Sequence, residues 1–370
     1  MNYLNRKILW YVLLDLKRDD LKKKIFITKL ISEADESLIS QVNCDVDRSI
    51  FECDDKKLQL KELILSVFTH NRSCFSYIQG MHDIASVFLE LFQSIEDDNK
   101  PIIEDIINEL DRLNKIYDIC ELKELIPVLV KKLESAKGRA VVCFLVFEKF
   151  LLKYSTPFIY KKNGKPSNLD YVLACIGEDL FYLIKMSSPS LFKLLESTRK
   201  NSSDSRTFMF TLSWVITWFS HNISIENTNI LFYLFENFIN NKPIYIIFFI
   251  EEVIIQNYDK LVDFLCLHLG FGNLVNLSPN NDIYPFIHLY FQNLNFNYIE
   301  WNSIVEKSRN SFERHKDVAF RSHALWSINS GFSIQEKPVL HIFNKNYYRQ
   351  AIYVLFILSG AVLAFFLISW

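Results

Sequence analysis

The last twenty residues of the chain, Ala351 to Trp370, contain no charged side chain. As a helix rising about 1.5 Å per residue, they would span about 30 Å, the thickness of the hydrocarbon core of a bilayer. Tyr353 and Trp370 lie near the two ends of this segment, where aromatic side chains favour the membrane interface. The alternative is a buried core helix, but such a helix rarely runs this long without a polar face. The sequence therefore predicts one transmembrane helix over residues 351–370.

Two basic residues, Lys345 and Arg349, come just before this segment. Because cytoplasmic flanks carry the excess of Lys and Arg, we expect the preceding domain to lie in the cytosol. The segment ends the chain, so we expect it to insert after synthesis as a tail anchor. Residues 331–350 lack clear periodicity and are expected to form the tether between this anchor and a domain over residues 1–330.

That domain is expected to be all-α, because apolar residues recur at helical spacing and the chain has only 8 Gly and 9 Pro. Its length exceeds the usual size of one hydrophobic core, which favours one large or two coupled helical subdomains. We place two subdomains at about residues 1–150 and 151–330. The clearest helices are expected over residues 79–92, 138–153, 205–219, 230–239 and 243–256. In the first of these, the apolar stripe leaves Asp83 and Glu90 off the buried face.

Composition excludes several classes of function. The net charge of −2 gives no support for a nucleic-acid partner, which would require a basic excess on one face. The seven cysteines lack a C-x-x-C pair and are expected to be reduced thiols, not a zinc site. Nucleotide-binding, metalloprotease and esterase motifs are all absent from the sequence. The chain is therefore expected to bind no cofactor or metal of its own.

Two short stretches carry the functional signal: Gln41–Ser49 (QVNCDVDRS) and, about 30 residues later, Tyr77–Asp83 (YIQGMHD). Together and in this order they resemble the signature of TBC-domain Rab GTPase-activating proteins. The family's first motif is an apolar residue, Asp, Arg and Thr or Ser at fixed spacing, and its second is Tyr-x-Gln-Gly. The matching residues here are Val42, Asp45, Arg48 and Ser49 for the first motif, and Tyr77, Gln79 and Gly80 for the second.

Further landmarks extend the resemblance over most of residues 5–300. Arg6–Trp10 is similar to the family's opening basic helix, Trp214–Phe219 to its central Trp-containing helix, and Lys242–Tyr245 to the start of the helix that follows. The resemblance is closest to the subgroup that ends in a transmembrane anchor at the endoplasmic reticulum. In that subgroup Gly-x-His-Asp follows the glutamine, as in Gly80–Asp83 here. The resemblance thus implies a TBC-like fold and an endoplasmic reticulum membrane.

The resemblance also implies the chemistry. Rab GTPases hydrolyse GTP slowly. An arginine supplied in trans stabilises the charge that develops on the phosphate and increases the rate of hydrolysis by about 10³–10⁵-fold. Arg48 matches this arginine finger, and Gln79 matches the glutamine that orients the attacking water. Asp45 lies one helical turn before Arg48 and is expected to fix its direction. Tyr77, Gly80 and Asp83 are expected to support Gln79. GTP and Mg²⁺ would be bound by the partner Rab, in its GTP form.

Plainer interpretations of these residues remain open. Arg48 with Asp45 or Asp47 could be a surface ion pair of little energetic value, and Gln79–Gly80 could be only the start of a helix. Trp214 and Trp218 are expected to be core residues. The family also commonly carries an Arg and an Asp on the helix after the Trp helix. Here the corresponding stretch, Ile230–Phe235, is apolar throughout, and Asp47 adds a negative charge beside Arg48.

Three functional hypotheses follow. The first is a membrane-anchored activator of a Rab of the early secretory pathway. The second is a tail-anchored helical adaptor that binds a Rab without stimulating hydrolysis. A membrane-bound lipid or sugar enzyme ranks last, because the sequence shows no recognisable nucleophile or metal set. The first hypothesis expects Arg48 and Gln79 to project into one exposed groove.

Overall fold

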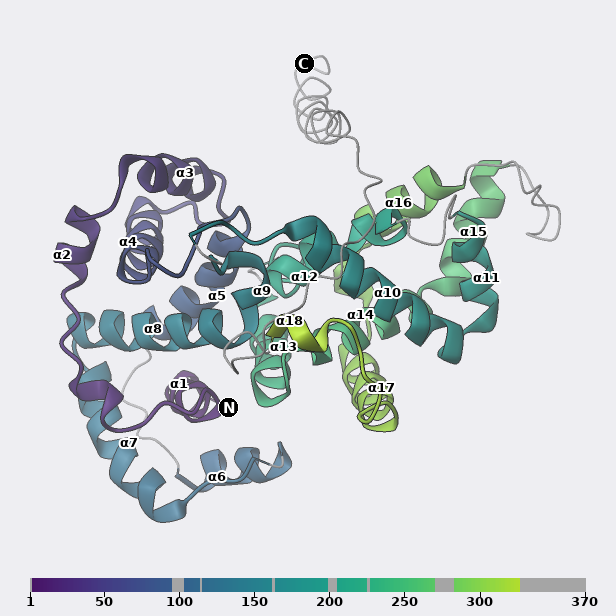
Figure 1. The fold of residues 1–370 in the computed structure, drawn as a ribbon. Coiled ribbons are helices and arrows are strands. Elements are labelled where there is room, and N and C mark those ends of the chain that lie inside the picture. Colours follow the sequence, from purple (N-terminus) through teal and green to yellow (C-terminus); the bar gives the residue numbers. More distant parts are fainter. Residues whose placement is uncertain are drawn as a thin grey trace. The chain divides into compact units, whose positions relative to one another are not determined.

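The computed structural model describes residues 2–94, 103–113, 115–161, 164–198, 205–224, 227–269 and 283–326. Within these ranges the regular structure is helical, apart from one isolated bridge between Phe75 and Tyr160. The expected all-α class is therefore confirmed for the described part of the chain (Figure 1). Residues 1–330 form one compact unit. The division of this unit into two subdomains stays a prediction.

The helices of the first half follow one another closely along the chain. They are α1 (Tyr3–Leu13), α2 (Ile27–Ser32), α3 (Glu36–Asp47), α4 (Asp54–His70), α5 (Met81–Gln93), α6 (Ile103–Arg112), α7 (Ile119–Leu133) and α8 (Ala136–Phe150). A π-helical segment, Leu151–Ser155, continues α8 into α9 (Thr156–Ile159). Helices α6 and α7 lie in a stretch for which the sequence gave no expected helix. The first turn of α7 is capped by Asp118, whose side chain accepts hydrogen bonds from the amides of Cys120 and Glu121.

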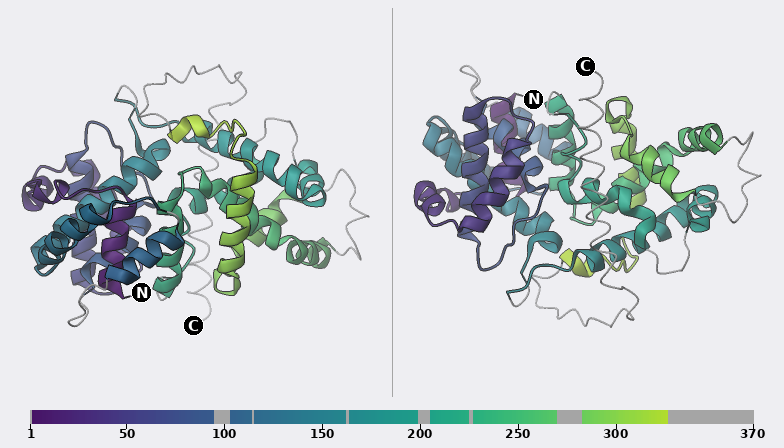
Figure 2. Two further views of the ribbon diagram at one scale, coloured as in Figure 1. Left: turned by 90° about the horizontal axis from the view of Figure 1, so that it is seen from below. Right: turned by 90° about the horizontal axis from the view of Figure 1, so that it is seen from above.

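The second half comprises α10 (Leu169–Ser187), α11 (Pro189–Ser197), the 3₁₀ segment Ser205–Thr211, α12 (Leu212–Thr217), α13 (Thr228–Asn240) and α14 (Tyr245–Gln256). It continues with α15 (Tyr258–Leu269), α16 (Tyr284–Gln292), the 3₁₀ turn Phe296–Tyr298, α17 (Trp301–Arg314) and α18 (His323–Trp326). Helix α17, yellow-green in Figures 1 and 2, packs along α14. The apolar helix α14 is buried on nearly all sides, which confirms the prediction of a core helix there.

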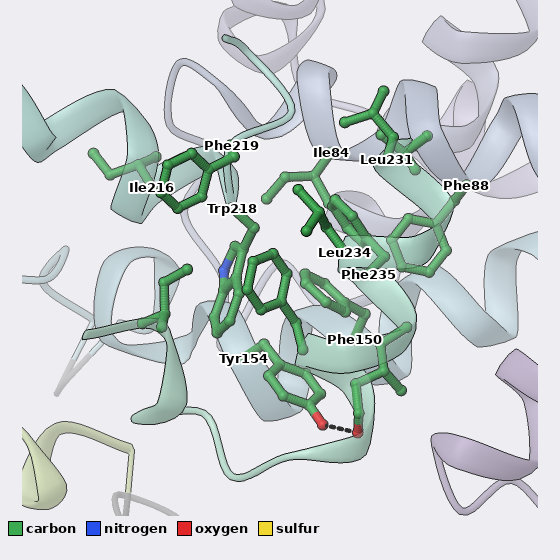
Figure 3. Packing of buried hydrophobic residues seen from close by; sticks show 14 of the residues in the cluster. Ile84, Phe88, Phe150, Tyr154, Ile216, Trp218, Phe219, Leu231, Leu234 and Phe235 are labelled. Atoms are coloured by element: carbon green, nitrogen blue, oxygen red, sulfur yellow. Dashed lines mark hydrogen bonds between the residues drawn. The ribbon is translucent and has the colours of Figure 1, made fainter. Parts of the chain in front are cut away.

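Helix α5 lies at the centre of the core and packs against α4, α8, α12 and α13. Its Phe88 ring contacts Trp10, Phe150 and Phe235, which belong to α1, α8 and α13. Figure 3 shows Phe88, Phe150 and Phe235 in one aromatic cluster with Trp218. Burial of such rings is the main source of stability in a chain this rich in Phe. The expectation that Asp83 lies off the buried face of α5 is wrong, because its side chain is buried.

The segment expected to form one helix over residues 205–219 differs in the structure. It begins as a 3₁₀ segment, becomes α12 at Leu212 and ends at Thr217. Trp218 and Phe219 then adopt left-handed conformations, with φ of 53° and 67°. Each such residue costs about 1–2 kcal/mol for an L-amino acid, so tertiary packing must hold them there. The rings of Trp218 and Phe219 are fully buried, and so is that of Trp214. The expectation that Trp214 and Trp218 are core residues is therefore confirmed.

No helix in the described ranges is both long enough and apolar enough to cross a membrane. The predicted transmembrane helix over residues 351–370 and the predicted tether over residues 331–350 lie outside those ranges. All seven cysteines lie within them and are free thiols, two of them, Cys143 and Cys175, buried.

Candidate functional site

The C-terminus of α3 presents Arg48 to solvent. The helix starts at the cap Asp35, whose side chain accepts a hydrogen bond from the Leu38 amide, and it ends at Arg48 in the capping position. The Arg48 side chain is 61% exposed, and its Nη2 lies 2.5 Å from Oδ1 of Asp45. Its Nε donates to the carbonyl oxygen of Cys44 at 3.1 Å. A cation at this helix end is favoured by the helix dipole, and the expected pairing of Arg48 with Asp45 is confirmed.

The carboxylate of Asp45 connects the two motifs. It is only 4% exposed, and its second oxygen accepts a 2.7 Å hydrogen bond from the hydroxyl of Tyr77. Burial and then the charge of Asp45 raise the pKa of Tyr77 well above 10, so the phenol remains a donor. The sequence suggested that Tyr77 supports Gln79. In the structure its hydroxyl helps to hold the carboxylate that contacts Arg48, and its support of Gln79 stays a prediction.

Gly80 sets the geometry of the second motif. Its φ of +99° lies in the region that favours glycine, and it directly precedes α5. A Cβ at this position would lie 2.9 Å from Cγ2 of Thr217 in α12, closer than carbon atoms pack. The motif therefore requires glycine here both for its backbone conformation and for the close approach of α12. Gln79, one residue earlier, is exposed.

Asp83 lies in a polar cluster with two histidines. Its Oδ1 is 3.3 Å from Nε2 of His82, and its Oδ2 is 3.0 Å from Nδ1 of His221. The other ring nitrogen of His82, Nδ1, lies 3.6 Å from Oδ2 of Asp45. The side chains of Asp45, His82 and Asp83 are each less than 10% exposed, so the cluster is largely shielded from water.

His221 is a site residue that sequence reasoning missed. It follows the left-handed pair at the end of α12 and reaches Asp83 across 138 residues of sequence. Nothing in its local sequence distinguishes it from the other seven histidines. Only its position in the sequence could have pointed to it, because His221 comes two residues after Trp214–Phe219, the stretch that resembles the family's Trp-containing helix.

The structure thus joins Arg48, Asp45, Tyr77, His82 and Asp83 through consecutive contacts. Gln79 lies between Tyr77 and His82 in sequence. Its carboxamide makes no hydrogen bond to the described part of the chain. Asp47 is exposed beside Arg48. A single groove containing both Arg48 and Gln79 stays a prediction. Among the described residues, no group of three or more His, Cys, Asp or Glu side chains is arranged to hold a metal ion.

The chain is similar to known proteins. The family model of the Rab-GTPase-TBC domain matches residues 5–262. A curated relative, the "GTPase-activating protein gyp10" of Schizosaccharomyces pombe, is 24% identical over 245 residues. This similarity covers 64% of the present chain and 48% of the relative, so the match spans about half of that protein's length.

Proposed function

The chain belongs to the Rab-GTPase-TBC domain family, and from this premise we propose that it stimulates GTP hydrolysis by a Rab GTPase of the early secretory pathway. Its yeast relative is named as a GTPase-activating protein, which supports the same activity here. The partner in its GTP form would supply the nucleotide and Mg²⁺. The present chain would supply two side chains, Arg48 and Gln79.

Arg48 is suited to act as the arginine finger. A guanidinium stays charged at all relevant pH values and offers five N–H donors in a planar fork that can contact two phosphate oxygens. In the free protein, Nε and Nη2 contact Cys44 and Asp45, while the side chain remains 61% exposed. The buried Asp45 carboxylate therefore anchors one side of the guanidinium and leaves donors on the other side for the phosphate.

Gln79 is suited to orient the attacking water. A carboxamide both donates and accepts hydrogen bonds, so it can contact a water molecule and the GTPase backbone together. The rigid turn at Gly80 fixes the chain next to it, and the Tyr77 hydroxyl is bonded two residues before it. Positioning of this kind provides much of the catalysis in phosphoryl transfer, because the protein forms no covalent bond to the substrate.

The single observation that carries the proposal is the shared Asp45 carboxylate. One of its oxygens binds Arg48 and the other binds Tyr77 of the Tyr-x-Gln-Gly motif. A surface ion pair with no function would not require a buried carboxylate that is hydrogen-bonded on both oxygens. An arrangement in which two catalytic side chains must act on one phosphate does require their supports to be rigidly connected.

The test is single-turnover GTP hydrolysis by a panel of Rab GTPases, with the full-length chain in detergent added. We expect at least one Rab to be accelerated, and Arg48→Ala and Gln79→Ala to reduce that acceleration by about 10³-fold or more. Arg48→Lys should also be strongly impaired, because an ammonium lacks the planar fork.

A matched control is Arg18→Ala. Arg18 is also exposed and paired with a carboxylate, that of Glu124, but it lies outside both motifs. It should leave the acceleration unchanged. Rab binding without any acceleration would instead support the adaptor hypothesis, and acceleration that survives both Arg48→Ala and Gln79→Ala would reject the two-finger mechanism.

We further propose that residues 351–370 anchor the chain in the endoplasmic reticulum membrane, with the domain in the cytosol. The uncharged segment and the preceding Lys345 and Arg349 support this proposal. Alkaline extraction should leave the full chain in the membrane pellet and release a chain that lacks residues 351–370. Protease added to intact microsomes should digest the domain. Recovery of the full chain in the alkaline supernatant would refute the anchor.

A further inference from the structure

A series of polar contacts with a buried middle runs from the first motif into the second and ends at a histidine that neither motif contains. Its members, in order of contact, are Arg48, Asp45, His82, Asp83 and His221, with Tyr77 bonded to Asp45 from the side. They come from the end of α3, the loop before α5, the first turn of α5 and the turn after α12.

His221 is the solvent-exposed member next to Asp83, as Arg48 is next to Asp45. Its side chain is 58% exposed, whereas that of Asp83 is 7% exposed. The Nδ1 atom of His221 lies 3.0 Å from the Asp83 carboxylate. This nitrogen therefore faces a buried carboxylate, while the ring that carries it is partly in solvent.

The turn that carries His221 contacts the second motif at two points. Thr217 packs against Gly80, and four residues later His221 binds Asp83. The His221 amide also donates to the Thr217 hydroxyl at 3.3 Å, which ties the two contacts together. Gly80 caps α5, Asp83 lies in its first turn, and Gln79 is two residues before its first residue, Met81. A change in the Asp83–His221 contact therefore acts on the helix start that follows Gln79.

We propose that His221 is a positioning residue: its imidazolium, bound to Asp83, holds the start of α5 against the α12 turn and so fixes Gln79 for hydrolysis. This inference rests on the proposed GTPase-activating function and adds to it a residue and a dependence on pH. His82 lies between the carboxylates of Asp83 and Asp45, 3.3 and 3.6 Å away, and its Nδ1 makes no hydrogen bond within the described part of the chain.

The direction of the pH dependence follows from the contact. The hydrogen bond to Asp83 raises the pKa of His221 above its usual 6.5, against the opposing effect of burial. Below this raised pKa the charged imidazolium binds Asp83, and the contact weakens as pH rises through it. Stimulated hydrolysis should therefore be highest on the acidic side of this transition and should fall on its alkaline side.

The experiment measures hydrolysis by the most responsive Rab between pH 5.5 and 8.5, divided at each pH by the intrinsic rate of that Rab alone. Full-length wild type is compared with His221→Asn and His221→Lys. We expect the wild-type ratio to fall by about threefold to tenfold across the range, since misplaced catalytic groups lose rate steeply. His221→Asn should show the lower ratio at every pH. His221→Lys, whose charge does not titrate in this range, should keep the higher ratio throughout.

The matched control is His70→Gln. His70 is similarly exposed, at 50%, and lies 3.8 Å from a carboxylate oxygen of Glu148 on α8, outside the cluster. It should show the wild-type profile. For the His221 variants any change should appear in kcat, with the KM for the Rab unchanged, because Gln79 acts on the reaction and not on docking.

The outcomes separate this inference from the proposed function. A wild type that accelerates its Rab with a profile shared by His221→Asn overturns the role of His221 and leaves the GTPase-activating function intact. An equal loss in His221→Asn and His221→Lys at every pH also overturns it, because the role would then be structural packing. A wild type that accelerates no Rab at any pH overturns both proposals.

Discussion

Tyr77 donates a 2.7 Å hydrogen bond to Oδ2 of Asp45, and the other oxygen of that carboxylate contacts Arg48. The two partners are 32 residues apart in sequence and come from different motifs. The Tyr77 ring is itself held by an edge contact with Phe68 of α4. Removing the hydroxyl and keeping the ring therefore tests the connection between the motifs without leaving a cavity in the core.

We predict that Tyr77→Phe lowers Rab-stimulated hydrolysis by about tenfold, because a buried carboxylate oxygen loses a donor worth about 1–3 kcal/mol. The control is Tyr245→Phe, which removes a buried hydroxyl bonded to Ser308 in α17. Urea unfolding and single-turnover hydrolysis should show lost stability in both variants but lost activity in Tyr77→Phe alone. Equal activity in the two variants would contradict the prediction.

Gly80 offers a test of backbone strain with an internal control. Gly80→Ala should reduce the free energy of unfolding by about 2–4 kcal/mol, from the positive φ and from the contact with Thr217. Gly164 has a positive φ of 75°, but no heavy atom lies within 4 Å of a Cβ built there. Gly164→Ala should therefore reduce the free energy of unfolding by only about 1–2 kcal/mol.

The difference between these two glycines should depend on the Thr217 methyl group. Adding Thr217→Ser to Gly80→Ala removes Cγ2 and should recover part of the loss, whereas adding it to Gly164→Ala should recover none. Urea unfolding of the four variants measures this directly. No recovery in the Gly80→Ala pair would show that the φ strain alone sets the cost.

Glu252 of α14 gives a prediction for stability against pH. It is 6% exposed, and burial, with a further contribution from the charge of Glu251, raises its pKa to about 7. A raised carboxyl pKa means that the folded state binds the proton more tightly than the unfolded state. The resulting stability is complete below the unfolded pKa of about 4.3 and is lost as pH rises through 7.

We therefore predict that Glu252→Gln stabilises the protein at pH 8 by about 1–3 kcal/mol relative to wild type, and by much less at pH 5. The control Glu196→Gln on α11 removes an exposed carboxylate and should change the unfolding free energy little at either pH. Chemical unfolding at the two pH values provides the measurement. An equal effect of Glu252→Gln at pH 5 and pH 8 would argue against a titrating Glu252.

A buried ion pair joins α1 to α13. Nε of Arg6 lies 2.6 Å from Oε1 of Glu236, and the two side chains are 11% and 3% exposed. Trp10 donates to the same oxygen, and the guanidinium stacks over the ring of Phe232. Removing one charge would leave the other buried without a partner, which is the costly case for such pairs.

We predict that Glu236→Gln lowers the unfolding free energy by about 3 kcal/mol, and that the double variant Arg6→Met/Glu236→Gln is more stable than Glu236→Gln alone. The exposed pair Lys17–Glu121 is the comparison, and Glu121→Gln should have little effect. Thermal unfolding ranks the variants. A double variant that is less stable than Glu236→Gln would mean that the Arg6 side chain contributes mainly through its packing on Phe232.

Sequence periodicity was sufficient to locate most of the core helices. The expected helices over residues 79–92, 230–239 and 243–256 correspond to α5, α13 and α14 within a few residues. Their long apolar stripes leave one plausible orientation toward the core. Asp45 and Arg48 could also be paired from their spacing alone, because both lie on the last turn of one helix.

The end of α12 could not be predicted. Neither Gly nor Pro marks the left-handed pair Trp218–Phe219, and local propensity favours continuing the helix. Packing of the Trp218 ring against Tyr154 and of the Phe219 ring against Trp301 outweighs that preference. Those contacts join residues far apart in sequence. His221 was missed for the same reason, since only this turn directs it to Asp83.

The left-handed turn also limits how short a working protein can be. All the candidate site residues of the two motifs precede residue 84, yet Gly80 and Asp83 are held by Thr217 and His221. The turn that carries those two depends in turn on Trp301, whose ring contacts Phe219 and stacks on Phe249. A fragment cut after α8 would keep the two proposed fingers, Arg48 and Gln79, and lose these contacts. The shortest fragment that keeps these contacts therefore has to extend into α17, well past the last motif residue. It also has to extend past residue 262, where the match to the family model ends.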